Sequence, residues 1–231
     1  MIRSVLCVVA LMAGYPAFAE ADDFGDRVRA YLLENPEVIL EALDILAKRE
    51  AQASVERRLE AFPELFADVP RHGLGDPDAP VRVIEFFDYR CVPCKAMHPR
   101  LVELVERRPE IRIEMRHLPI LSPGSERAAR FALATLAVAG DAAYAQVHDL
   151  LWAPRGGLND ASFERIAAEL GLDFGAIAAE MDGDAVSARI SYNRDVAISL
   201  EILGTPAFVT PVSVRFGEAD VDELAEVWLS R

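Results

Sequence analysis

A Cys-x-x-Cys pair between a strand and a helix constrains this chain more than any other feature. Residues 81–87 are short, apolar and rich in β-branched and aromatic side chains, which indicates a buried strand. Cys91 and Cys94 follow, and residues 92–107 have the pattern of a helix. Alternation with a period of two over residues 111–115 predicts a second strand. The cysteines therefore lie where the first strand of a β-α-β unit meets its helix.

The C-terminal half predicts a helical insert and a closing β-β-α unit. Residues 125–203 are rich in alanine, and glycines divide them into several helices. Strands are expected at residues 207–209 and 212–216, followed by an amphipathic helix from Val221. This order predicts an α/β fold in which a small mixed sheet carries helices on its faces.

The stretch before the first strand predicts a helical extension, residues 20–70. Apolar residues recur at helical spacing over residues 24–66, with a break at Asn35–Pro36. The apolar stripe is partial and needs a partner surface, which is either the rest of the chain or another copy of it. Prolines and glycines over residues 63–80 indicate a linker.

The first residues predict a secretory signal that is cleaved after about Ala19. An apolar run over residues 5–13 precedes the small-residue pattern of residues 17–19. An uncleaved anchor is the alternative, although the run is about half the roughly 20 residues that a span requires. Cleavage would remove Cys7 and leave Cys91 and Cys94 as the only cysteines. We therefore expect an exported protein.

Charge and cysteine count exclude several functions. The formal net charge of −14 argues against nucleic-acid binding, which needs a clustered positive surface. Two cysteines three positions apart cannot join distant parts of a fold, and closing so small a loop stabilises little. In an oxidising compartment the pair is better explained by chemistry than by scaffolding.

The position of the pair predicts different roles for the two sulfurs. At the first turn of a helix, unpaired N–H groups and the helix dipole stabilise a thiolate, so Cys91 is expected to be an open, water-exposed nucleophile. Cys94, one turn further, is expected to be shielded and to resolve the mixed disulfide. Pro93 removes one N–H donor, which predicts only moderate stabilisation of the Cys91 thiolate and a less oxidising pair.

Two further features support this chemistry. Thr205-Pro206 precedes a strand, which by itself is more typical of an ordinary trans loop, but together with the Cys-x-x-Cys pair in its place before a helix it predicts a cis peptide bond. Glu85 interrupts the apolar first strand. If buried, its pKa would be raised and it would suit a proton acceptor for Cys94; on an edge strand it would merely face solvent.

Residues 83–95, followed by Gly204-Thr205-Pro206-Ala207-Phe208-Val209, resemble the DsbA-like family of periplasmic thiol–disulfide oxidoreductases. The resemblance covers roughly residues 76–231 and implies a thioredoxin fold with a helical insert at about residues 122–203. Residues 33–39 are similar to the N-terminal helical region of ScsC-type members, some of which oligomerise and act as disulfide isomerases.

The resemblance implies a site and a set of partners. Cys91 would be the nucleophile, Thr205 and Pro206 would bind substrate, and Glu85 would assist proton transfer. Substrates would be cysteine-containing exported proteins, and a membrane redox partner would reset the pair. No organic cofactor is needed, because the cysteines carry two electrons. Val92-Pro93 matches neither the Pro-His of strong oxidases nor the Gly-Tyr frequent in ScsC-like members, so oxidase and isomerase directions both stay open, with Thr205 favouring isomerase.

Two other functions compete with this one. Cys91, Cys94 and His98, with His117 as a fourth ligand, could bind copper or zinc, although His98 is as easily a solvated side chain. Alternatively, the pair forms a structural disulfide in an interaction protein. Tyr89 and Trp152 could line a peptide groove or pack in the core, whereas core packing is favoured for Phe87. His72 and His148 are interpreted as isolated surface or locally satisfied residues.

Overall fold

A computed structural model describes residues 19–67, 72–154 and 156–230 of this chain. The predicted signal segment lies outside these ranges except for its last residue, Ala19. No helix within the described ranges is both long and apolar enough to cross a membrane.

The chain divides into two compact units, Met1–Glu50 and Ala51–Arg231. Helices α1 (Ala19–Glu34) and α2 (Glu37–Leu59) begin the described chain, and α2 continues across the division. The predicted break at Asn35–Pro36 is confirmed, because α1 ends before it and α2 begins within two residues. None of the α2 side chains is buried.

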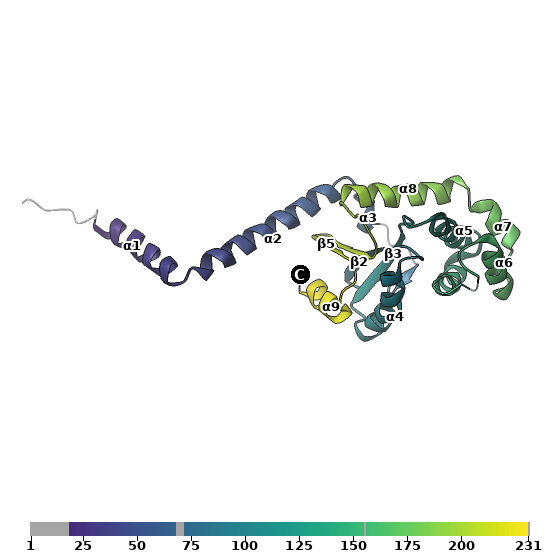
Figure 1. Ribbon diagram of the computed structural model, residues 1–231, viewed down its shortest axis with the longest axis horizontal. Helices are drawn as coiled ribbons and strands as arrows, with labels where there is room; N and C mark the ends of the chain where they lie inside the picture. The colour runs from purple at the N-terminus through teal and green to yellow at the C-terminus, as the bar shows by residue number, and fades with distance from the viewer. Residues whose placement is uncertain (1–18, 68–71, 155, 231) are drawn as a thin grey trace, which may run out of the picture. The chain divides into compact units, whose positions relative to one another are not determined.

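A mixed sheet of five strands forms the centre of the second unit (Figure 1). Its strands run in the order β1-β3-β2-β4-β5. Strand β2 is parallel to β3 and antiparallel to β4, which puts β2 in the middle of the sheet. The strands are β1 (Gly73–Leu74), β2 (Val81–Phe87), β3 (Ile111–His117), β4 (Ala207–Thr210) and β5 (Ser213–Phe216).

Helices cover both faces of this sheet. Figure 1 shows α4 and α9 on one face and α8 on the other, with α5, α6 and α7 grouped beyond the sheet. The helices of this unit after α2 are α3 (Glu64–Ala67), α4 (Val92–Arg107), α5 (Pro123–Leu151), α6 (Asp160–Glu169), α7 (Phe174–Glu180), α8 (Asp184–Ser199) and α9 (Val221–Leu229). The helical insert predicted between the two parts of the sheet is thus confirmed as α5 to α8.

The alternation of side chains along β2 builds two separate cores. Val83 and Phe87 belong to the cluster that includes residues of α4, α9 and the insert. Ile84 and Phe86 point the other way and pack with a second cluster that includes Val196 of α8. A strand buried on both faces explains why the sequence of β2 is almost continuously apolar.

The observed strands differ from the predicted ones mainly at β3 and β1. Strand β3 continues to His117, because its partner β2 pairs with it over the whole length. The two-residue strand β1 falls in the stretch interpreted as a linker, and it pairs antiparallel with β3. A strand of two residues is too short to show a sequence pattern, so it is recognised only by its pairing with β3.

Candidate active site

Cys91 forms the N-cap of α4, as the sequence predicts. Its backbone is extended, with φ −70° and ψ 113°, and its Sγ accepts a hydrogen bond from the Cys94 backbone N–H at 3.2 Å. Pro93 stands at the preceding helical position and has no N–H to offer. The N-cap sulfur therefore receives one backbone hydrogen bond where an N-cap acceptor can receive two.

The loop before β4 faces this sulfur. The Thr205–Pro206 peptide bond is cis, as predicted. The Cys91 thiol donates a hydrogen bond to the Thr205 carbonyl oxygen at 3.1 Å, across a sequence separation of 114 residues. The fold thus brings together the two motifs that the sequence analysis singled out.

The environment separates the acidities of the two thiols. The Cys94 thiol, which hydrogen-bonds to Cys91 Sγ, lowers the pKa of Cys91 to about 6, with a further contribution from the Cys94 backbone N–H and opposed by burial. Burial and the same thiol contact raise the pKa of Cys94 far above its ordinary value. At neutral pH the arrangement favours a thiolate at Cys91 and a protonated Cys94.

The expected exposure of Cys91 is wrong. Its side chain is only 4% exposed, because Thr205 and the first turn of α4 close around it. The sulfur is not sealed in the interior, since Cys91 lines a surface hollow of about 410 Å³. The other residues that line this hollow include Tyr89, Trp152 and Leu158. Cys94 is fully buried, as expected.

Glu85 lies in the middle of the sheet and not on an edge. It is 0% exposed, and neither carboxylate oxygen has a hydrogen-bond partner among the described residues. It shares its face of β2 with Val83 and Phe87, the face that α4 covers. Burial, with a smaller contribution from the Cys91 charge, raises the pKa of Glu85 to about 8. Its charge also contributes to the raised pKa of Cys94.

The alternative metal site is not assembled. Within residues 19–67, 72–154 and 156–230, no three His, Cys, Asp or Glu side chains gather where they could hold a metal ion. His98 is buried, contrary to the solvated alternative, and its Nε2 lies 3.6 Å from the Asp149 carboxylate. His117 Nε2 lies 3.0 Å from the Tyr144 hydroxyl oxygen. Both histidines are thus engaged with other partners.

Of the two interpretations of His72 and His148, the surface position is wrong, whereas local satisfaction is confirmed for His148, which accepts a hydrogen bond from the Trp152 indole N–H four residues later. Both are buried and both contact the Tyr144 ring: His72 is tilted against it at a centroid distance of 4.8 Å, and His148 stacks on it at 5.6 Å. His148 also hydrogen-bonds to Tyr89 and Trp152. Neighbours brought in by tertiary packing leave no trace in the local sequence.

Asp88 is a site residue that the sequence analysis missed. Its side chain is buried and accepts hydrogen bonds from the backbone N–H groups of Arg90, Ile120 and Leu121, at 2.8, 3.0 and 3.1 Å. Its carbonyl oxygen accepts from the Cys91 N–H at 3.0 Å. Asp88 thereby holds the loop that precedes α4, and its only sequence signal is an aspartate placed before a turn.

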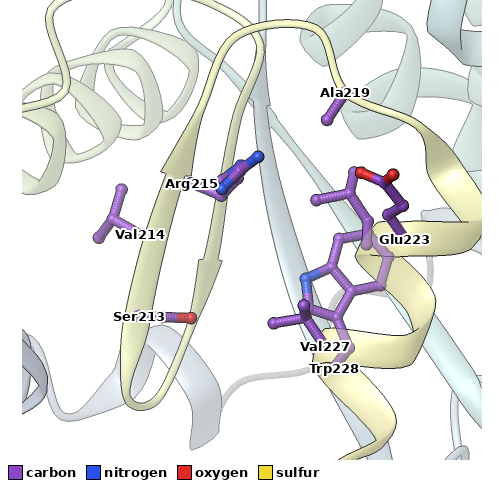
Figure 2. Close-up of a pocket in the computed structure, with 8 residues that line it drawn as sticks. Ser213, Val214, Arg215, Ala219, Glu223, Val227 and Trp228 are labelled. Carbon is purple, nitrogen blue, oxygen red and sulfur yellow. The ribbon is translucent and has the colours of Figure 1, made fainter. Parts of the chain in front are cut away.

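A second hollow, of about 340 Å³, lies between β5 and α9 and contains no cysteine (Figure 2). Arg215 and Glu223 approach it from opposite sides, and the Trp228 indole and Val227 project from α9 toward β5. Because Cys91 lines the first hollow and this second one offers no thiol, we keep the candidate site at Cys91.

Two protein families match this chain. Residues 82–228 match the DSBA-like thioredoxin domain, and residues 20–53 match the family described as the copper resistance protein ScsC N-terminal domain. The first match covers the sheet except for β1 and the first residue of β2, and it includes the insert and the cysteine pair. The second covers most of α1 and α2.

Individual relatives agree with these matches. A thioredoxin-like oxidoreductase from Silicibacter pomeroyi is 34% identical, with a TM-score of 0.66 over 74% of this chain and 96% of its own. Proteus mirabilis ScsC in a compact conformation is 25% identical, with a TM-score of 0.65 over 90% of this chain and 96% of its own.

Part of a longer curated protein, a sodium/proton antiporter, is also similar in sequence to this chain. The Na(+)/H(+) antiporter NhaA 3 of Salinispora tropica is 30% identical over 69% of this chain. This chain spans only 24% of the length of that relative. The match over residues 82–228 and the mixed sheet with its helical insert show that the chain belongs to the DSBA-like thioredoxin domain family.

Proposed function

We propose that this protein catalyses thiol–disulfide exchange in exported proteins. The observation that carries the proposal is the position of Cys91, which caps α4, lies against Cys94 and contacts the Thr205 carbonyl oxygen. A helix N-cap cysteine with a lowered pKa is the arrangement that a nucleophilic thiolate needs. Membership of the DSBA-like family supports the same activity.

In this proposal the two thiols act in sequence. The Cys91 thiolate attacks a substrate disulfide, forms a mixed disulfide and releases one substrate thiolate. Cys94 then attacks Cys91 Sγ, releases the second substrate thiolate and leaves a Cys91–Cys94 disulfide. The substrate gains two electrons and the enzyme loses two; the reverse sequence oxidises a substrate dithiol.

Glu85 is proposed to manage the proton of Cys94. Cys94 must lose its proton to attack, and it is buried without access to bulk solvent. A buried carboxyl group whose pKa is raised to about 8 exchanges protons near neutral pH, which suits this task. The electrostatic interaction of the two groups supports their proximity.

Substrate is proposed to bind at the Thr205–Pro206 loop and along the hollow beside Cys91. Backbone groups of such a loop can pair with an extended substrate segment, and this mode of binding depends little on side chains. Only one backbone N–H donates to the Cys91 sulfur, so we expect this cysteine pair to be less oxidising than the pair of a strong oxidase. Thr205 favours an isomerase.

Localisation, partners and assembly form part of the same proposal. We infer export to the periplasm after cleavage near Ala19, and a membrane redox partner that resets the cysteine pair. Family members of this kind act on exported cysteine-containing proteins. Large apolar side chains on α2 are exposed, which supports assembly of several copies through the N-terminal helices.

The experiment measures two activities of the chain from which only the signal segment has been removed: refolding of scrambled ribonuclease and reduction of insulin. Catalysis of either reaction that is lost in Cys91→Ser supports the proposal. Catalysis of ribonuclease refolding in excess of insulin reduction identifies an isomerase. If the wild-type protein catalyses neither reaction, or if Cys91→Ser stays as active as the wild type, the proposal is wrong.

A further inference from the structure

All four histidines of the chain lie in one buried cluster beside the loop that carries Cys91. Ring contacts connect them, directly between His98 and His148 and otherwise through tyrosine rings. We call this group the histidine cluster; its members are Phe87, Tyr89, Tyr144, Trp152, His72, His98, His117 and His148. The proposed exchange mechanism uses none of these histidines.

The hydrogen bonds of His148 determine its protonation. The Trp152 indole can only donate, and its Nε1 lies 3.2 Å from His148 Nε2, so Nε2 must accept. A neutral imidazole then carries its single proton on Nδ1. This Nδ1–H donates to the Tyr89 hydroxyl oxygen, 2.7 Å away. His148 thus connects a tryptophan and a tyrosine that lie in different parts of the chain.

Beyond Tyr89 lies Tyr144, whose hydroxyl oxygen is 3.0 Å from His117 Nε2. A second proton on His148 would lie on Nε2 and point at the Trp152 indole N–H, so that two donors would face each other. Burial keeps the pKa of His148 well below its ordinary value and so preserves the single proton on Nδ1.

The two partners of His148 form walls of the hollow around Cys91. Tyr89 precedes Cys91 by two residues, and Trp152 is the C-cap of α5 in the helical insert. Their rings lie 5.0 Å apart, and both line the hollow. His148 is buried behind them and is not part of the lining.

We propose that His148 is a positioning residue, which fixes Tyr89 and Trp152 against each other and so shapes the part of the substrate site beside Cys91. This proposal rests on the proposed thiol–disulfide exchange. Tyr89 and Trp152, with Val92 and Leu158, give the hollow an aromatic and aliphatic side, and Arg90 and Lys95 line it as well. The side formed by Tyr89 and Trp152 fits an apolar side chain next to the substrate cysteine, and His148 determines how well that side chain is held.

The test compares two variants on two substrates, with the cleaved full-length protein. His148→Phe removes both hydrogen bonds, whereas His148→Gln keeps one donor and one acceptor. The substrates are a peptide disulfide with a leucine beside the cysteine and 2-hydroxyethyl disulfide, which is too small to reach both walls. We expect His148→Phe to raise KM for the peptide about tenfold with little change in kcat, and to leave the small disulfide within about twofold. His148→Gln should recover most of the peptide affinity.

Tyr89→Phe provides an independent variant, because it keeps the ring in the wall and removes only the bond to His148. It should raise the peptide KM in the same direction, and it decides the question if His148→Phe does not fold. Equal losses on both substrates, or no change in peptide KM in the variants that fold, would overturn the proposal. A wild-type protein inactive on both substrates would instead refute the proposed exchange activity.

Discussion

At the scale of single residues, opposing effects on the Cys91 sulfur determine its reactivity. The hydrogen bond from the Cys94 thiol lowers its pKa, while burial of a nearly inaccessible sulfur raises it. The balance leaves the pKa at about 6, so most of the sulfur is thiolate at neutral pH. Pro93 limits this stabilisation, because it occupies the position from which a second backbone N–H would reach the sulfur.

Replacing Pro93 should therefore make the thiolate more stable. In Pro93→Ala the new N–H can donate to Cys91 Sγ, and we expect the pKa to fall by about one unit, since a hydrogen bond to a charged group contributes about 1.5–3 kcal/mol. The absorbance of the thiolate at 240 nm, followed against pH, measures the change. Val92→Ala, which adds no donor, is the matched control. An unchanged pKa in Pro93→Ala would show that the missing donor has no influence.

Glu85 should make the stability of the reduced protein depend on pH. Its pKa is raised from 4.5 to about 8 on folding, so the folded state holds this proton more tightly than the unfolded state. The free energy of unfolding should consequently fall by about 1.4 kcal/mol per pH unit between pH 5 and pH 8 from this group alone. Urea unfolding at several pH values should show a flatter dependence in Glu85→Gln. The same slope in both proteins would contradict a protonated Glu85.

At the scale of secondary-structure elements, the position of a strand or a break decides what its residues can do. Glu85 is buried because β2 lies between β3 and β4, and its face follows from alternation along the strand.

In α5 the helix is interrupted at Gly140, whose φ of 80° and ψ of −176° suit glycine almost alone. The sequence analysis expects glycines to divide this region into helices, and the backbone of Gly140 shows how one of them does so.

A side chain at residue 140 should strain this break. A Cβ there would meet no atom within 4 Å, so only the backbone conformation opposes the substitution. Gly140→Ala should lower the free energy of unfolding by about 2 kcal/mol. Gly25→Ala is the matched control, because Gly25 is equally open but lies within α1 with no positive φ. Chemical denaturation measures both, and equal effects of the two substitutions would contradict the strain.

At the scale of the whole molecule, α2 is the element whose apolar side chains are least accounted for. Ile39, Leu40, Leu43 and Leu46 are all about half exposed or more, and no α2 side chain is buried. Their helical spacing makes a stripe of the kind that packs against another helix. An exposed stripe of this size is typical of an association surface.

The oligomeric state of the cleaved full-length protein should depend on this stripe. We expect light scattering to give a mass greater than one chain, and the double variant Leu40→Glu with Leu43→Glu to give a monomer. Arg49→Gln, a polar change on the same helix, should leave the mass of the assembly unchanged. A monomeric wild-type protein would end the hypothesis that this stripe joins copies of the chain.

The sequence alone determined the strand-cysteine-helix junction, the N-cap position of Cys91 and the missing donor at Pro93, because each depends on neighbours within one turn of helix. It also predicted the cis bond before β4. Only the tertiary structure decided that Cys91 is nearly buried, that Glu85 is central, and that His148 joins Tyr89 to Trp152. The contacts of Cys91 with Thr205 and of Tyr89 with His148 span 114 and 59 residues. Local spacing carries no information about such contacts, because packing of the insert and β4 against the first β-α-β unit creates them.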